Sequence, residues 1–297
     1  NCKLCSKSMK GIRMKSLDFL FKEIDYYTSE LKIDSIHFVD ELLLINKKRF
    51  FEFCRRIKKY NIQWDCQGRI NYVDEKILRA MKASNGVCIG FGIESGSQKI
   101  LDAMDKRIKV KDIEKALTIC QKIQLPMKIQ LIFGYPGENW QTLNETISLF
   151  KKVRLPARRF TVITPLPGSQ LYEDAKNDGF IGEKDSDVIS EEDYLILLSK
   201  TGGLVSNEIF YNHTELSNEE FYETLLKVEN TIFNNFLKSL FLHPFYSIRN
   251  LSTNKLYLKN WWDYYKYRIL IFHFPEYIGK FIRNPFKFLK NLKLYRK

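Results

Sequence analysis

The chain has 297 residues, of which 44% are apolar and 14% aromatic, enough to bury the core of one barrel-sized domain with an extension. Its six cysteines form no close-set framework, which argues against a secreted disulfide scaffold and favours a reducing, cytoplasmic compartment. The net charge of +13 is concentrated at the C-terminus, where Lys255 to Lys297 hold eleven Lys or Arg against two acids.

Short apolar segments alternate with amphipathic ones along the first 180 residues. The expected helices are Ser16–Leu31, Lys47–Tyr60, a helix capped by Asp74 that reaches Lys82, Gln98–Met104, Lys111–Lys122, Trp140–Val153 and Gln170–Asn177. The expected strands are Ser35–Asp40, Ile62–Arg69, Val87–Ile93, Met127–Phe133 and Phe160–Thr164. Strict alternation predicts a parallel sheet, and hence an α/β fold: a partial (β/α)6 TIM-like barrel with a mainly helical C-terminal extension.

Charged residues follow several of these strands. The pair Asp40 and Glu41 follows the first strand, Arg69 ends the second and Glu94 stands at the tip of the third. Ligands of α/β barrels bind at the carboxyl ends of the strands, so these residues are candidate ligand-binding groups. The acidic pair also suits the first turn of a helix.

One of these residues, and one histidine, also have a structural interpretation. Arg69 has possible ion-pair partners in Asp65 and Asp74. His37 lies within a strand and is expected to be a core residue with its hydrogen bonds satisfied. Neither interpretation assigns these residues a role in chemistry.

Two glycines lie in the strand that ends at Glu94, and a third follows it. Gly90 and Gly92 lie two residues apart, on one face of the strand, where they allow another group to approach the backbone. Gly96 permits the turn into the next helix. The run lacks the G-x-G-x-x-G spacing, so it does not indicate a dinucleotide site.

The N-terminus carries two cysteines three positions apart, Cys2 and Cys5. Thiolates are the ligands that zinc and iron–sulfur clusters prefer, although a lone pair of this kind also occurs in redox pairs and zinc knuckles. A cysteine four positions before Cys2 would complete a CxxxCxxC sequence, so we interpret the sequence as a fragment. The other four cysteines are expected to be small core residues: Cys54, Cys66, Cys88 and Cys120.

In order and spacing, several segments of residues 1–180 together resemble the radical S-adenosylmethionine (SAM) enzymes, in particular the class that often carries an N-terminal cobalamin-binding domain. The matching segments are Asn1–Cys5, Phe38–Glu41, Gly68–Arg69, Met81–Gly86, Gly92–Ser97, Gly134–Glu138 and Thr164–Tyr172. Leu4 departs from the family, in which an aromatic residue often precedes the last cysteine.

The resemblance implies a [4Fe–4S] cluster held by three cysteines, with SAM on the fourth iron and its reductive cleavage to a 5′-deoxyadenosyl radical. Cys2 and Cys5 match the second and third of these cysteines. Asp40 or Glu41 matches the position near the SAM ammonium group, and Arg69 and Glu94 match positions near its carboxylate, ammonium or ribose. The remaining SAM positions implied by the resemblance are Gly92, Ser95, Gly134 and Thr164.

Three domains are expected: the core barrel over 1–180, a loop-rich cap over 181–212, and a helical, basic and aromatic extension over 213–297. A helix from Glu219 to Leu242 has Ser217 as its expected N-cap. The basic tail could lie on an anionic membrane surface or pack on its own domain. Nucleic-acid binding is not expected, because no recognised binding module accompanies the charge.

The sequence therefore predicts an enzyme that acts on a small-molecule or lipid-like substrate, with a one-electron donor such as flavodoxin or ferredoxin. Cobalamin is a further expected cofactor, held by a domain outside this chain, for radical methylation or rearrangement. Two alternatives stay open: a barrel without a cluster that acts as a scaffold at a membrane surface, and a zinc-dependent barrel.

Overall fold

The computed structural model describes residues 3, 14–39, 43–153, 159–182, 189–200, 212–228 and 231. All of them belong to one compact unit, Asn1–Ser247. A second unit, Ile248–Lys297, lies outside the described residues, and so does the basic tail. Across the described residues, no helix combines the length and the apolar character needed to cross a membrane.

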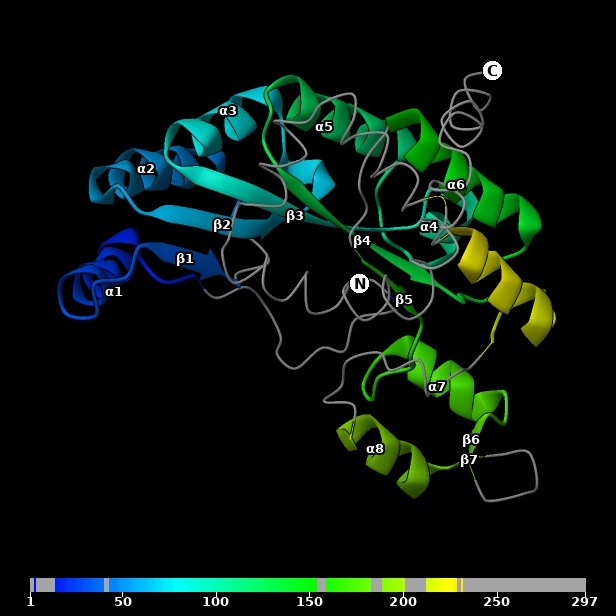
Figure 1. The fold of residues 1–297 in the computed structure, drawn as a ribbon. Helices are drawn as coiled ribbons and strands as arrows, with labels where there is room; N and C mark the ends of the chain where they lie inside the picture. Colours follow the sequence, from blue (N-terminus) through cyan, green and yellow to red (C-terminus); the bar gives the residue numbers. More distant parts are fainter. Residues whose placement is uncertain are drawn as a thin grey trace, which may run out of the picture. The chain divides into compact units, whose positions relative to one another are not determined.

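Five parallel strands form the main sheet, and they pair in chain order from β1 to β5. Their bounds are β1 Ser35–Phe38, β2 Gln63–Gly68, β3 Gly86–Glu94, β4 Met127–Phe133 and β5 Arg159–Val162. Each connection between neighbours contains a helix, as parallel pairing requires. The sheet curls into part of a barrel (Figure 1), which confirms the predicted α/β fold with a partial TIM-like barrel.

Helices separate the strands of this sheet. Their bounds are α1 Leu17–Ser29, α2 Lys47–Ile57, α3 Glu75–Ala83, α4 Gln98–Ala103, α5 Val110–Lys122 and α6 Trp140–Val153, with single 3-10 turns at η1 Lys58–Tyr60 and η2 Ile70–Tyr72. Helices α2, α3, α5 and α6 lie along one face of the sheet (Figure 1). The main apolar core fills the space between these helices and the sheet, with Phe50, Phe53, Trp64, Phe91 and Phe133 fully buried.

The helices begin where the sequence places cap residues. Ser16, Asn46 and Asp74 each accept a hydrogen bond from the backbone N–H three residues later, which satisfies a donor that the helix itself leaves unpaired. Strand β4, helix α6 and the helix Gln170–Asn177 have the predicted bounds, and the other predicted elements of residues 1–180 differ by a few residues.

Strand β1 differs from its predicted bounds and burial more than the other strands do. It ends at Phe38 instead of Asp40, and its alternate residues Ser35 and His37 are exposed, because β1 is the edge strand of the described sheet. The prediction that His37 is a core residue is wrong: its side chain is 48% exposed. Its Nδ1 nevertheless contacts the Asp65 carboxylate on β2, so the expectation of a satisfied polar group holds.

A second, smaller apolar cluster follows the barrel. It joins helix α7, Gln170–Asn177, to helix α8, Glu191–Lys200, and to the two-residue parallel strands β6, Ile181–Gly182, and β7, Ile189–Ser190. The buried Tyr194 hydroxyl donates to the Pro165 carbonyl at 2.6 Å, which ties α8 to the end of β5. The sequence predicted a loop-rich segment here, and helix α8 was missed because its hydrophobic face is short and weakly periodic.

Residues 218–228 form a further helix, whose N-cap is Ser217 as predicted. Ser217 Oγ accepts from Glu220 N, and Glu220 Oε2 accepts from Ser217 N, which is a reciprocal capping box. Phe221, Leu225 and Val228 belong to the main core of the barrel. This helix therefore packs with the barrel, and the rest of the predicted Glu219–Leu242 helix, apart from residue 231, lies outside the described residues.

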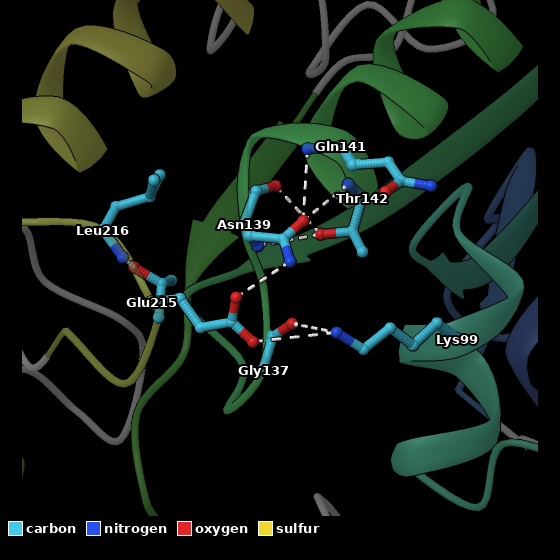
Figure 2. Close-up of polar contacts among 8 residues, drawn as sticks. Lys99, Gly137, Asn139, Gln141, Thr142, Glu215 and Leu216 are labelled. Atoms are coloured by element: carbon cyan, nitrogen blue, oxygen red, sulfur yellow. Dashed lines mark hydrogen bonds and ion pairs between the residues drawn. The ribbon is translucent and has the colours of Figure 1, made fainter.

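Polar contacts connect the residues just before the 218–228 helix to the start of helix α6 (Figure 2). Asn139 is the N-cap of α6, because its Oδ1 accepts from the backbone N–H groups of Gln141 and Thr142. Its Nδ2 donates to Glu215 Oε2 at 2.9 Å, and Glu215 N donates to the Glu138 carbonyl at 2.8 Å. Lys99 of α4 completes the group with an ion pair to Glu215 at 3.7 Å.

Replacement of Asn139 with alanine should lower the free energy of unfolding by about 1 to 2 kcal/mol, because the N-cap of α6 and the bond to Glu215 are lost together. Urea unfolding measures this loss. Gln141→Ala is the matched control, because Gln141 is exposed and contributes only its backbone N–H to this network. Equal stability of the two variants would contradict the role of Asn139 as a cap.

Candidate functional site

The predicted site residues that the structure describes lie at the carboxyl ends of four neighbouring strands. Arg69 follows β2, Glu94 ends β3, Gly134 follows β4 and Thr164 lies two residues beyond β5. The parallel register brings these ends to one edge of the sheet: Gly68 pairs with Phe91, and Phe133 with Val162. The structure thus places these predicted residues along one edge of the sheet.

Glu94 is the most constrained residue of this edge. Its backbone is left-handed, with φ of +60°, and the pairing of β3 with β4 shifts register between Gly92 and Glu94. Such a conformation is unfavourable for a residue with a side chain, by about 1 to 2 kcal/mol, and persists only where the surroundings impose it. The surroundings include a buried ion pair, because Lys106 Nζ lies 2.5 Å from Glu94 Oε1.

The second carboxylate oxygen of Glu94, Oε2, is buried and has no hydrogen-bond partner within the described part of the chain. Buried polar atoms are nearly always paired, so this carboxylate oxygen is a candidate acceptor for a hydrogen-bond donor of a ligand. Thr164 Oγ1, at the end of β5, is a second buried oxygen of this kind among the described residues.

Gly92 leaves room for the folded-back Glu94 side chain. A Cβ at this position would lie 2.6 Å from Glu94 Oε1, so the close approach predicted for this glycine occurs, and the approaching group belongs to the chain itself. At Gly90 the nearest atom to such a Cβ is Gln67 Cγ, at an ordinary 3.6 Å. Packing within the described residues therefore requires glycine at position 92 and not at position 90.

The turn after β4 is held by a buried carboxyl group. Gly134 has φ of +96°, and its N–H donates to Glu138 Oε2 at 2.7 Å. Burial raises the pKa of Glu138 to about 7, although the backbone N–H groups of Gly134 and Tyr135 oppose the shift. Glu138 thereby fixes the backbone of Gly134, which packs against Ile163, the neighbour of Thr164.

Arg69 is exposed, and its expected ion pairs do not form. Asp74 pairs with Lys47, and Asp65 is engaged by His37 and Lys128. The structural interpretation of Arg69 as a partner of Asp65 or Asp74 is therefore wrong.

Ser95 lies in the turn between β3 and α4 and is buried. Its hydroxyl lies 3.2 Å from the Thr146 hydroxyl of α6 and accepts from Ser97 N at 3.1 Å. These contacts make Ser95 part of the packing of the turn on α6. A contact of Ser95 with SAM remains a prediction.

Cys2, Cys5, Asp40 and Glu41 lie outside the described residues. Lys3, between the two cysteines, is described: its N–H donates to the Met104 carbonyl after α4 at 3.1 Å, and its carbonyl accepts from Leu171 N in α7 at 3.3 Å. The four other cysteines are buried core residues, as predicted. Within the described ranges, no three His, Cys, Asp or Glu side chains are grouped to hold a metal ion.

The sequence did not reveal two residues of this edge. Lys106 lies in the loop after helix α4. No motif in the sequence around it predicts that it pairs with Glu94. Glu138 belongs to a segment that matched the family, but no role was assigned to it. The only available signal was its position directly after the glycine turn.

A comparison with protein families matches residues 1–150 to the model described as Radical SAM superfamily. An uncharacterized methyltransferase of Pyrococcus horikoshii is 33% identical over 178 residues, which are 58% of this chain and 39% of that protein. The anaerobic magnesium-protoporphyrin IX monomethyl ester cyclase of Rubrivivax gelatinosus is 24% identical over 179 residues, 58% of this chain and 32% of the cyclase. The chain thus spans less than half the length of these relatives.

Two solved structures share the fold. TsrM of Kitasatospora setae, a radical SAM methyltransferase with cobalamin and a [4Fe–4S] cluster bound, has a TM-score of 0.57 at 13% identity, over 83% of this chain and 55% of TsrM. The cobalamin-dependent SAM radical enzyme OxsB has a TM-score of 0.53 at 15% identity, over 90% of this chain and 48% of OxsB. Because the family model covers half of the sequence, this chain belongs to the radical SAM superfamily, whose members are enzymes that bind a [4Fe–4S] cluster and SAM.

Proposed function

We propose that this protein holds a [4Fe–4S] cluster through Cys2 and Cys5 and cleaves SAM reductively at the carboxyl edge of its sheet. The observation that carries the proposal is Glu94, at the end of a central strand of a radical SAM chain: its backbone is left-handed, and its buried carboxylate has one oxygen without a partner among the described residues. When bound, the cluster supplies one electron to the sulfonium of SAM.

The residues at this edge suit the polar groups of SAM. Glu94 Oε2 can accept a hydrogen bond from a ribose hydroxyl or from the ammonium group of SAM. Arg69, exposed at the end of β2, can bind the carboxylate as a fork of donors. The Gly134 backbone and the unpaired Thr164 hydroxyl offer contacts along the adenine side. The roles of Gly92, Ser95, Asp40 and Glu41 remain part of the proposal.

The proposal is tested on the full-length protein, reconstituted with iron and sulfide without oxygen. We expect about four irons per chain and formation of 5′-deoxyadenosine from SAM and a chemical reductant. Cys5→Ala should lose both. Glu94→Gln should keep the iron and weaken SAM binding about tenfold or more, because a charge-assisted hydrogen bond is lost.

Glu52→Gln is the matched control, since Glu52 lies on α2 and pairs with Arg55 away from the strand ends. Iron-free protein without cleavage would refute the proposal. Full iron and unchanged SAM affinity in Glu94→Gln would refute the placement of SAM at Glu94 while leaving the cluster chemistry intact.

We further propose methyl transfer as the reaction class, with cobalamin held outside the described residues. The support is that the Pyrococcus horikoshii relative and TsrM are both named methyltransferases. Methyl transfer leaves S-adenosylhomocysteine, whereas reductive cleavage leaves 5′-deoxyadenosine and methionine. Both nucleosides should therefore form in the presence of substrate. Formation of 5′-deoxyadenosine alone would favour a rearrangement or cyclisation.

A small-molecule substrate and a one-electron donor such as flavodoxin or ferredoxin complete the proposal. The domain division at 180 and 212 is proposed as well, with the helix of residues 218–228 packed on the barrel. The alternative of a scaffold without a cluster at a membrane is not favoured by the family match, and its basic tail lies outside the described residues.

A further inference from the structure

Helices α1 and α2 expose several large apolar side chains to solvent. Phe19 and Tyr26 of α1 are 52% and 55% exposed, and Phe51 of α2 is 39% exposed. Of the eleven large apolar side chains that are exposed among the described residues, seven lie within residues 14–51, so they are not scattered singly over the surface. Clustered exposed apolar side chains mark a surface that binds another molecule.

The two helices lie side by side and run in the same direction. Arg56 of α2 pairs with Asp18 of α1 at 2.7 Å. Further along both segments, the Tyr60 hydroxyl of η1 donates to Asp25 of α1 at 2.5 Å. The order of these contacts places each exposed ring of α1 at the level of a cation of the neighbouring segment: Phe19 at Arg55, and Tyr26 at Lys59.

Basic side chains dominate the second helix. Residues 47–60, which form α2 and η1, hold seven Lys or Arg and one acid, Glu52. Arg55 pairs with Glu52 at 2.6 Å. Lys48, Lys58 and Lys59 are exposed and have no ion-pair partner within the part of the chain that the structure describes. The segment therefore keeps a positive charge that its described neighbours do not neutralise.

The exposed rings and cations share one side of each helix. We call six of them the basic aromatic face: Phe19, Tyr26, Lys48, Phe51, Arg55 and Lys59. On α2 and η1 these residues recur at three- or four-residue spacing, and on α1 they lie about two turns apart. The side of α1 that carries Phe21 and Ile24 is buried in the core. The basic aromatic face therefore points away from the core.

The acids of α1 next to this face do not cancel its charge. Each of the three is engaged within the chain: Asp18 with Arg56, Glu23 with Lys15, and Asp25 with the Tyr60 hydroxyl. Lys48 and Lys59, which lie on the face, have no such partner among the described residues. The charge of the face is thus complementary to that of an anionic surface.

We propose that the basic aromatic face binds the surface of a membrane that contains anionic lipids. Lys and Arg near such a surface are attracted to lipid phosphates, and aromatic rings insert at the level of the headgroups. A partner attracted by charge alone would leave the three rings in water, whereas the headgroup region accommodates rings and cations together. The contact is peripheral, because the apolar sides of both helices are buried in the protein's own core. The inference does not depend on the SAM chemistry.

The first test compares two pairs of lysines in the full-length protein. Binding is measured by sedimentation with vesicles of phosphatidylcholine alone, or of phosphatidylcholine and phosphatidylglycerol at a ratio of about two to one. We expect binding to the anionic vesicles only, and weaker binding as salt is added. Lys48→Gln with Lys59→Gln should weaken it about 25-fold, at about fivefold for each cation removed. Lys111→Gln with Lys115→Gln removes the same charge from the exposed side of α5 and should leave the binding nearly unchanged.

The second test addresses the aromatic rings. Tyr26→Ser should weaken binding to the anionic vesicles about fivefold, because the ring no longer inserts among the headgroups. Tyr222→Ser is the matched control, since Tyr222 is 60% exposed on the helix of residues 218–228, and it should leave the affinity unchanged. The basic tail is present in every variant, so the differences between variants isolate the basic aromatic face.

Absence of binding to anionic vesicles, or equal losses in the two lysine pairs, would overturn the inference. A loss with the pair Lys48 and Lys59 but not with Tyr26→Ser would overturn the lipid partner and favour a soluble polyanion such as a nucleic acid. Iron content and formation of 5′-deoxyadenosine are measured on the same preparation without vesicles. Failure of the proposed function therefore leaves the vesicle result intact, and failure of vesicle binding leaves the proposed function intact.

Discussion

Replacing Lys106 with methionine should lower the free energy of unfolding by about 3 to 5 kcal/mol, because it breaks a buried ion pair. Lys106 is the only described partner of Glu94 Oε1, at 2.5 Å, and both side chains are largely buried, at 16% and 9% exposure. Without Lys106, the Glu94 carboxylate would be buried with neither oxygen paired to a described residue. Urea unfolding at neutral pH measures the loss.

The double variant Glu94→Gln with Lys106→Met should recover part of this loss, because no uncompensated charge is then buried. Lys99→Met is the control, since Lys99 is exposed and its ion pair with Glu215 is long. If Lys106→Met were no less stable than Lys99→Met, the ion pair would contribute nothing to stability. The strained backbone of Glu94 would then need another explanation.

The sequence predicted the barrel well because each of its elements carries a local signal. Helix α6 has apolar residues at helical spacing, β4 has buried apolar residues at alternate positions after Pro126, and both have the predicted bounds. The cap residues Asp74 and Ser217 act as expected, since capping depends on only three or four neighbouring residues. The edge strand β1 was the exception. Its burial depends on which strands flank it, which the pattern of one segment does not reveal.

The site could be predicted only in part, because its contacts join distant segments. The position of Glu94 at a strand end follows from alternation, but its pairing with Lys106 and its left-handed backbone do not. His37 illustrates the same limit: its strand suggested a core residue, whereas its partner Asp65 lies 28 positions later on a neighbouring strand. Interactions of this kind are set by register and by the curl of the sheet.

Glu138 should make the stability of the protein fall as the pH rises from about 5 to 8. Burial raises the pKa of this carboxyl group from 4.5 to about 7, so between those values the folded protein keeps a proton that the unfolded chain releases. The unfolded state then binds fewer protons, and the free energy of unfolding declines with pH. At about 1.4 kcal/mol for each pH unit, the full contribution is about 3 kcal/mol.

Glu138→Gln separates this contribution from that of other groups, because the amide does not titrate and its oxygen can still accept from Gly134 N. Urea unfolding of both proteins at pH 5 and pH 8 should show the glutamine variant gaining about 3 kcal/mol relative to the unmodified protein over that range. Glu145→Gln, an exposed change on α6, the helix that follows Glu138, should leave the pH dependence as it is. A constant difference between Glu138→Gln and the unmodified protein would mean that folding does not raise the pKa of Glu138, and would contradict this prediction.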